Sequence, residues 1–334
     1  MAEEIAFWGE ILLRLSPPDR KRLRQAYTFE AYYGGSEANV AVSLAQWNLK
    51  TRFITRLPDN NLGQAALDAV ARYGVGIGHA LRGGKRIGLY FLESGHGRRG
   101  GCVLYDRDDS GMATVQASML NAARLLEGVA HLHWSGITPA LSHTAAEATL
   151  ALLRAARERG ISVSCDLNLR KNLWQYGRRP IEVMPELVTL TDILIGDRSA
   201  IRICLGVEAP GSDTAFLLQK TQDAYPNLQT IAATSREGFS ASHNAYQGML
   251  LHDGGFWSSQ RHDLPDILER IGAGDAFAAG LLYGIRQGWD AQRLIEFATA
   301  AGAFKHYVAG DANIATQAEI MALAEGDSGA KVKR

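Results

Sequence analysis

The segment Arg270–Gly280 reads Arg-Ile-Gly-Ala-Gly-Asp followed by an alanine-rich run, and its spacing suits phosphate chemistry. Two glycines allow a tight turn in which successive N–H groups point at one spot, and a helix predicted to begin near Asp275 adds the positive end of its dipole. Such an anion hole would stabilise charge developing on a transferred phosphoryl group. The Asp275 carboxylate could accept the proton of an attacking hydroxyl. A glycine turn capped by aspartate explains Gly272-Ala273-Gly274-Asp275 equally well.

A second glycine turn, Gly34-Gly35-Ser36, precedes a predicted helix. Paired glycines between a strand and a helix permit close approach of the backbone to a ligand. Asn39, one turn into that helix, can present its amide to sugar hydroxyls. Taken alone, the motif is better explained as a capped helix start with Asn39 facing solvent.

Polar residues also follow the run Ile161–Leu167, which predicts a buried strand. Period-2 alternation places Asp166, Asn168 and Arg170 on one side at the carboxyl end of this strand. The planar fork of an arginine suits a carboxylate or a phosphate. A surface ion pair between Asp166 and Arg170 remains an alternative.

Other motifs are incomplete. Gly74-Val75-Gly76-Ile77-Gly78 follows a predicted helix and has His79 where a dinucleotide loop needs its third glycine. The sequence contains no Gly-x-x-x-x-Gly-Lys-Ser/Thr loop. His131 and His133 share one face of a predicted strand without a nearby third ligand, which favours buried structural histidines over a zinc site.

The elements that position these residues alternate along the chain. Strands are predicted over 5–15, 51–57, 129–135, 161–167, 192–195 and 228–234, and helices over 62–73, 142–159, 275–287 and 291–307. This order predicts an α/β fold with a mostly parallel sheet, helices on both faces and ligands beyond the carboxyl ends of the strands. Segments 16–35 and 81–107 break the alternation and look β-rich, the latter with a hairpin of 86–93 and 102–106. We expect them to form a small lid inserted in one domain spanning 1–334.

The composition narrows the class of partner. The chain has 334 residues, 46% of them hydrophobic, and 35 basic side chains balance 35 acidic ones. The net charge is therefore close to zero, and the overall electrostatic field of the protein gives no indication of a nucleic-acid or membrane partner. Three scattered cysteines argue against a disulfide framework, and the acidic start Met1-Ala2-Glu3-Glu4 does not look like a signal peptide. We expect a soluble, cytoplasmic protein.

Together, the two glycine motifs are more specific than either alone. Gly34-Gly35-Ser36-Glu37-Ala38-Asn39-Val40-Ala41 near the start and Gly272-Ala273-Gly274-Asp275-Ala276-Phe277 near the end resemble the ribokinase-like (PfkB-type) carbohydrate kinase family. The resemblance covers most of the chain and is strongest to the 2-keto-3-deoxygluconate kinases. Supporting stretches are 9–17, 90–93, 105–107, 133–138 and 166–170. The fold implied is a ribokinase-like three-layer core with a small β-rich lid.

The resemblance implies ATP-dependent phosphorylation of 2-keto-3-deoxygluconate, with Mg²⁺ as the metal. It implies Asp275 as the base and the backbone of Gly272, Ala273 and Gly274 as the anion hole. Residues matching positions that hold the sugar acid are Gly34, Gly35, Asn39, Tyr90, Tyr105, Arg107, Arg170 and Asp311. Those matching the nucleotide site are Asn168, Ser235, Arg236, Gly238, Gly272 and Gly274. Of these, Ser235, Arg236 and Gly238 lie in a predicted loop over 234–238.

The physical chemistry of the residues agrees with a sugar acid. Arg107 from the lid and Arg170 from the core could clamp a carboxylate, while Tyr90 and Tyr105 cover the sugar. One departure concerns the metal: the Asn-x-x-Glu motif typical of the family is matched by Asp197-Arg198-Ser199-Ala200, which lacks the glutamate. Asp197 could contact magnesium through water.

Three alternatives stay open. The substrate could be another sugar or sugar acid, such as fructose or 2-keto-3-deoxygalactonate, or the protein could be a sugar-binding relative with weakened catalysis. We also expect a homo-oligomer, on family grounds a dimer formed through the lid.

Overall fold

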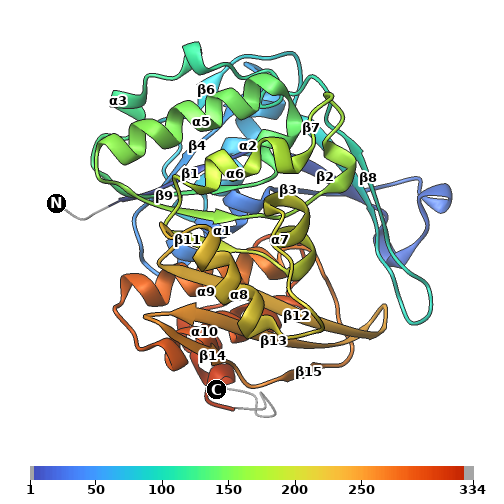
Figure 1. Cartoon of the computed structure of the whole chain (residues 1–334). Coiled ribbons are helices and arrows are strands. Elements are labelled where there is room, and N and C mark those ends of the chain that lie inside the picture. Colours follow the sequence, from blue (N-terminus) through green and yellow to red (C-terminus); the bar gives the residue numbers. More distant parts are fainter. Residues whose placement is uncertain (1–3, 327–334) are drawn as a thin grey trace.

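A central sheet runs through the middle of the molecule in the computed structural model, which describes residues 4–326 (Figure 1). Nine strands of this range form it, and the six from β12 to β4 are parallel neighbours. Antiparallel strands complete one edge. The order is β14 (Gly255–Ser258), β13 (His243–His252), β12 (Thr230–Ser240), β11 (Ile193–Ile195), β10 (Ser162–Asp166), β9 (Val129–Ser135), β1 (Glu4–Trp8) and β4 (Thr51–Ile54), with β15 (His262–Leu264) beside β13.

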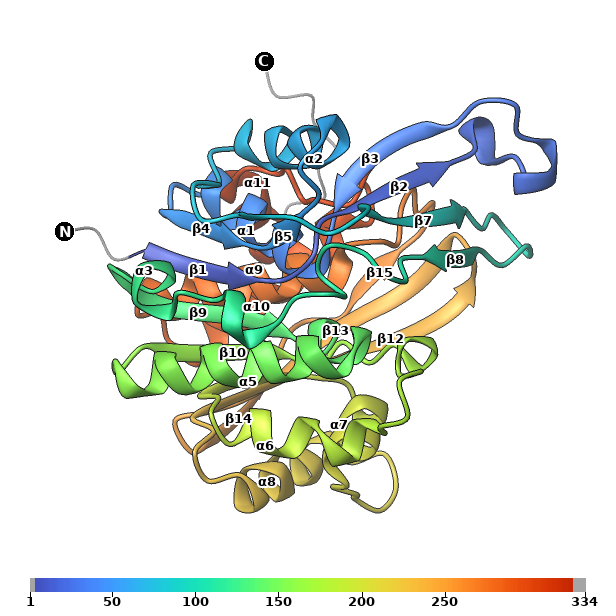
Figure 2. The ribbon, with the colours of Figure 1, turned by 90° about the horizontal axis from the view of Figure 1, so that it is seen from above.

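Helices cover both faces of this sheet because its strands are apolar on both sides (Figure 2). On β1, Ile5 and Phe7 pack into one apolar core, whereas Ala6 and Trp8 pack into the other. The first core is covered by α1 (Ser36–Gln46), α2 (Asn61–Ala71), α9 (Ala273–Arg286), α10 (Ala291–Lys305) and α11 (Gln317–Ala324). The second is covered by α3 (Ala122–Leu125), α5 (His143–Glu158), α6 (Met184–Val188), α7 (Arg198–Leu205) and α8 (Thr214–Ala224), and α4 (Thr138–Leu141) precedes α5. The predicted three-layer α/β architecture is therefore confirmed.

A separate, smaller sheet stands out from one side of the core (Figure 2). Its strand order is β3 (Glu30–Gly34), β2 (Leu12–Ser16), β7 (Gly88–Glu93) and β8 (Cys102–Asp106). Three of these strands come from the segments 16–35 and 81–107, and β7 with β8 forms the predicted antiparallel hairpin. The remaining pair, β5 (Arg56–Leu57) and β6 (Leu81–Arg82), lies apart from this sheet.

Three predicted segments were wrong in extent. The strand expected over 51–57 is divided between β4 in the large sheet and β5, which pairs with β6. The single strand expected over 5–15 is divided between the two sheets at Gly9, whose Cα lies so close to the Glu37 carboxylate that an added Cβ would be 2.1 Å from Oε2. The loop expected over 234–238 is instead part of β12, which continues to Ser240 and pairs with β13 through a tight turn. The local sequence does not indicate where these strands break or continue, because each boundary depends on contacts with segments far away in the chain.

Within residues 4–326, no helix is both long and apolar enough to cross a membrane. The prediction that the acidic N-terminal segment is not a signal peptide concerns Met1-Ala2-Glu3-Glu4, and the first three of these residues lie outside the described residues.

Candidate active site

A cavity of about 790 Å³ lies beyond the carboxyl ends of β10 and β11 and beside the middle of β12, between the small sheet and the first turns of α1 and α9. This is the position at which open α/β sheets bind their ligands. Most of the predicted site residues line it: Gly35, Asn39, Tyr90, Tyr105, Arg107, Asn168, Arg170, Asp197, Ser235, Arg236, Gly272, Gly274, Asp275 and Asp311. Gly34, Ala273 and Gly238 are not among its lining residues.

The turn that begins α9 is built on Gly272, whose φ is 82°. An added Cβ at this position would lie 1.9 Å from the Asp311 carbonyl oxygen, so the close approach and the left-handed backbone both require glycine. The first hydrogen bond of the helix runs from the Ala276 N–H to the Gly272 C=O over 2.9 Å. The N–H groups of Ala273, Gly274 and Asp275 precede that bond and lack intrahelical acceptors. Two of these amides, those of Ala273 and Gly274, belong to the predicted anion hole, which stays a prediction.

Asp275 is 8% exposed and is held by two neutral donors from α1. The Ser36 hydroxyl donates to Oδ1 over 2.8 Å, and the Asn39 amide donates to Oδ2 over 2.7 Å. Burial raises the pKa of Asp275, and these two hydrogen bonds oppose that shift. Asn39 thus faces the site rather than solvent, as the predicted function requires.

Ser36 also links Asp275 to the neighbouring strand end, because its hydroxyl accepts from the Asn168 amide over 2.7 Å. Ser36 was not among the predicted site residues. Its position directly after the glycine pair was the available signal, but a helix-capping role explained it equally well. Asn168 itself has φ 35° and lies in the turn that follows β10.

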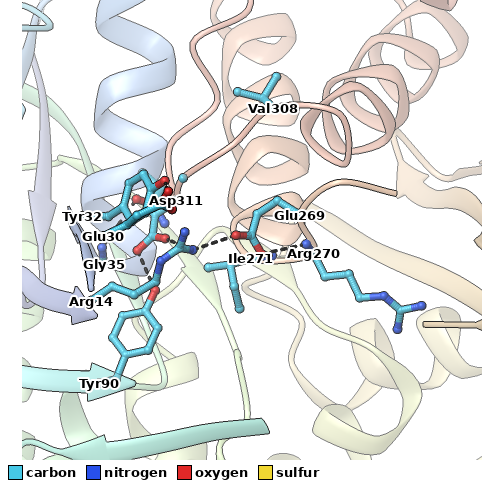
Figure 3. Close-up of polar contacts among 12 residues, drawn as sticks. Arg14, Glu30, Tyr32, Gly35, Tyr90, Glu269, Arg270, Ile271, Val308 and Asp311 are labelled. Atoms are coloured by element: carbon cyan, nitrogen blue, oxygen red, sulfur yellow. Dashed lines mark hydrogen bonds and ion pairs between the residues drawn. The ribbon is translucent and has the colours of Figure 1, made fainter. Parts of the chain in front are cut away.

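Asp311 and residues of the small sheet line one end of the cavity, and Figure 3 shows Tyr90 beside Asp311. The Tyr90 hydroxyl donates to Asp311 Oδ2 over 2.6 Å, and burial raises the pKa of Tyr90 well above its usual value. Gly34 backs this carboxylate, since an added Cβ would lie 2.3 Å from Oδ2. The ring of Tyr105 lies 6.0 Å from that of Tyr90. Two tyrosines and a carboxylate provide hydrogen-bonding groups suited to sugar hydroxyls.

The two arginines expected to bind a carboxylate lie in different environments. Arg170 is exposed and lines the cavity. Arg107 is 4% exposed, and its Nε donates to Glu10 over 3.0 Å while Nη2 contacts the same carboxylate oxygen. Glu10, which the sequence analysis did not assign, therefore orients Arg107 and offsets part of its charge.

Several polar groups occupy the side of the cavity formed by β10, β11 and β12. Burial, with a contribution from Asp275, raises the pKa of Asp166 to about 7. Ser235 and Arg236 are exposed on β12, whereas Gly238 lies farther along this strand in an adjoining groove. Asp197 caps α7, since its Oδ1 accepts from the Ala200 N–H over 2.7 Å.

The histidine pair lies away from this chemistry. His131 and His133 are buried, and both rings hydrogen-bond the Ser164 hydroxyl. Burial lowers the pKa of each to about 3. The prediction of buried structural histidines is confirmed. Among residues 4–326, no group of three or more histidine, cysteine, aspartate or glutamate side chains is arranged to hold a metal by itself.

Comparison with known proteins gives consistent matches over nearly the whole chain. Residues 2–317 match the profile described as pfkB family carbohydrate kinase. A 2-dehydro-3-deoxygalactonokinase from Haloferax volcanii is 31% identical over 330 residues, covering 98% of this chain and 99% of the relative. A 2-dehydro-3-deoxygluconokinase from Bacillus subtilis is 24% identical over 308 residues, covering 91% and 90%.

A solved structure supports the same relationship. That of a 2-dehydro-3-deoxygluconokinase from Thermotoga maritima matches with a TM-score of 0.93 at 38% identity, over 98% of this chain and 99% of the other. This protein therefore belongs to the pfkB family of carbohydrate kinases.

Proposed function

We propose that this kinase transfers the γ-phosphoryl group of ATP to the 6-hydroxyl of 2-keto-3-deoxygluconate, also called 2-dehydro-3-deoxygluconate, to give 2-keto-3-deoxy-6-phosphogluconate. The observation that carries the proposal is the Asp275 carboxylate, which Ser36 and Asn39 hold at the start of α9 in a cavity that also contains Arg170. The names of the relatives from Bacillus subtilis and Thermotoga maritima support a keto-deoxy sugar acid as the substrate.

Asp275 would act as the general base. The substrate hydroxyl oxygen attacks the γ-phosphorus, its proton passes to the Asp275 carboxylate, and the bond to the bridging oxygen of the departing ADP breaks. The N–H groups of Gly272, Ala273 and Gly274 would donate to the phosphoryl oxygens as charge spreads over them. Positioning and charge stabilisation supply most of the rate enhancement in such a reaction.

The remaining predicted contacts divide between the two ends of the cavity. Gly34, Gly35, Asn39, Tyr90, Tyr105, Arg107, Arg170 and Asp311 would hold the sugar acid, and the small sheet would act as a lid that excludes water. For ATP, we assign Asn168, Ser235 and Arg236 to the part of the cavity along β10 and β12, and Gly238 to the adjoining groove. Gly272 and Gly274 would contact the phosphates.

Magnesium would serve as the metal that neutralises the phosphates. Asp166 and Asp197 present carboxylates to the cavity, and carboxylate oxygens are ligands that Mg²⁺ accepts beside water and phosphate. One oxygen of Asp197 caps α7, which leaves the other available to a metal-bound water. Ala200 stands where the family motif has glutamate, so most metal ligands would come from ATP and water.

A second substrate is favoured by one specific observation. The Haloferax volcanii relative, which matches across 99% of its own length, is named a 2-dehydro-3-deoxygalactonokinase. The two acids differ at one hydroxyl centre, and nothing in the charge of the cavity separates them. We therefore carry 2-keto-3-deoxygalactonate as the alternative acceptor.

We also propose a cytoplasmic homodimer formed through the outer surface of the small sheet. β8 is exposed along its length, and Leu104 is 51% exposed. An exposed apolar edge strand is a surface that proteins commonly cover. Light scattering of the purified chain should give a mass near twice 36.3 kDa, and a monomer at all concentrations would contradict the proposal.

An ATP-coupled assay over a small panel tests the substrate directly. We expect turnover with 2-keto-3-deoxygluconate, less or equal turnover with 2-keto-3-deoxygalactonate, and little with fructose, because the neutral sugar cannot pair with Arg170. Excess EDTA should abolish turnover, and added Mg²⁺ should restore it. Efficient use of fructose alone, or no use of any acceptor, would refute the sugar-acid assignment.

Asp275→Asn tests the base. The substitution keeps the size and the neighbours of the side chain but removes the proton acceptor, so kcat should fall about 10²- to 10⁴-fold. Binding of the sugar acid, measured by calorimetry, should change little. A variant that phosphorylates at the parent rate would show that Asp275 is not the base.

Ser36→Ala tests how Asp275 is tuned. The base works as a carboxylate, so the rate is lost as the pH falls through its pKa. The Ser36 hydroxyl lowers that pKa by donating to Oδ1. Its removal should move the acidic limb of the kcat/KM profile to higher pH, as measured between pH 4 and 9. A limb that stays in place, or moves to lower pH, would contradict the assignment.

Arg170→Ala tests recognition of the carboxylate. Loss of one charge-assisted contact should raise KM for the sugar acid about 10- to 100-fold, with a much smaller effect on the analogue whose carboxylate is reduced to an alcohol. Arg154→Ala is the matched control, because Arg154 pairs with Glu186 on the surface and changes the net charge equally. Equal binding of the acid and its uncharged analogue by the parent protein would rule out the clamp.

A further inference from the structure

A buried guanidinium joins the small sheet to two carboxylates contributed by the last quarter of the chain (Figure 3). Arg14, on β2, places Nη1 2.6 Å from Asp311 Oδ1 and 2.9 Å from Glu269 Oε2. Its guanidinium also lies 4.2 Å from the centre of the Tyr32 ring. Arg14 is 2% exposed and is not among the residues lining the cavity, so it reaches the site through its partners.

One partner, Glu269, holds the backbone that leads into the anion hole. Its Oε1 accepts from the N–H of Arg270 over 3.0 Å and from the N–H of Ile271 over 3.2 Å. Ile271 directly precedes Gly272, where the turn begins. Since Arg14 binds the other oxygen of this carboxylate, the position of the turn depends on the Arg14–Glu269 pair.

The other partner, Asp311, belongs to the sugar end of the cavity. Its side chain binds Tyr90 and Arg14, while its own carbonyl oxygen packs against the Cα of Gly272. Lys305 secures the turn before it, because Nζ donates to the carbonyls of Val308 and Gly310 over 2.9 and 2.8 Å. A shift of Asp311 would therefore move the turn in two ways. It would act directly, through the contact between the Asp311 carbonyl and Gly272, and indirectly, through Arg14 and Glu269.

We propose that Arg14 is a positioning residue that couples the sugar end of the cavity to the phosphoryl-transfer turn, by holding Asp311 and Glu269 in one buried ion cluster. The inference rests on the proposed function and assigns a role outside the substrate contacts. A substrate that hydrogen-bonds Asp311 competes with Arg14 for the same carboxylate, and the change is transmitted through Glu269 to the amides before Gly272. Without Arg14, both carboxylates would lose their ion-pair partner, and the buried Lys305 ammonium, which also attracts them, would be left to oppose their repulsion without binding either one directly.

The test compares Arg14→Met with a matched loss of a buried ion pair elsewhere. Arg52 on β4 pairs with Glu4 on β1 and donates to the Leu125 carbonyl, and both residues lie at the amino end of the parallel strands, opposite the cavity. Arg52→Met should lower the unfolding temperature and leave kcat and both KM values near those of the parent. Arg14→Met should lower the unfolding temperature, reduce kcat and raise KM for the sugar acid, each about 10-fold or more, while KM for ATP changes far less.

Two further variants separate positioning from folding. Arg14→Lys keeps the charge and should restore part of kcat, whereas Glu269→Gln keeps an acceptor for the two amides and should reduce kcat with little effect on sugar KM. In the double variant that combines Arg14→Met with Glu269→Gln, the loss of kcat should be smaller than the product of the two single-variant losses, because both changes act on the same turn.

The outcomes distinguish this inference from the proposed function. An Arg14→Met protein that loses stability but keeps the parent kcat and sugar KM would overturn the coupling, as would strict additivity with Glu269→Gln. Absence of turnover by the parent with every sugar acid would refute the substrate assignment instead. In that case, sugar-independent ATP hydrolysis still reports on the turn, and a rate equal in Arg14→Met and Arg52→Met would overturn the coupling.

Discussion

The backbone turn at Gly272 is the constraint on which the rest of the site depends. Its positive φ directs the first amides of α9 toward the cavity, and the helix that follows holds Asp275 beside them. The Asp311 carbonyl packs so closely against Gly272 that a side chain there would displace the sugar end of the site as well. One glycine thus brings the proposed phosphate-binding backbone, the proposed base and a proposed sugar contact into a single arrangement.

The buried carboxylates around this turn are stabilised in two different ways. Glu10, Asp311 and Glu269 each pair with an arginine. Asp275 takes part in no ion pair within residues 4–326 and is held by the neutral groups of Ser36 and Asn39. A paired cation would stabilise the carboxylate and weaken it as a base, whereas burial with neutral donors keeps it fixed and still basic. In the proposed reaction, the three arginine pairs therefore organise the site without forming an ion pair with the proton acceptor.

Local sequence predicted the parts of the site that lie within one motif. The Gly-Ala-Gly-Asp turn, the Gly-Gly turn with Asn39, and the polar end of β10 each contain their own spacing signal, and the structure brings all three to one cavity. Arg14 and Glu10 were missed because their partners, Asp311 and Arg107, are 297 and 97 residues away. The extension of β12 beyond Thr234 was missed for a related reason: its polar residues resemble a loop until β13 supplies their hydrogen bonds.

The different environments of Arg107 and Arg170, which both line the cavity, affect how the protein would discriminate a sugar acid from a neutral sugar. Glu10 already compensates Arg107, so a substrate carboxylate gains less there than an uncompensated cation would provide. The Arg170 side chain, within the described residues, has a hydrogen bond only to the carbonyl of the adjacent Leu169, over 3.4 Å. Its charge lowers the pKa of Asp166 and of Asp275, but it forms no ion pair among the described residues that a ligand carboxylate would have to break. Discrimination by charge should consequently reside mainly in Arg170, with Arg107 serving as a rigid, directional donor whose orientation Glu10 sets.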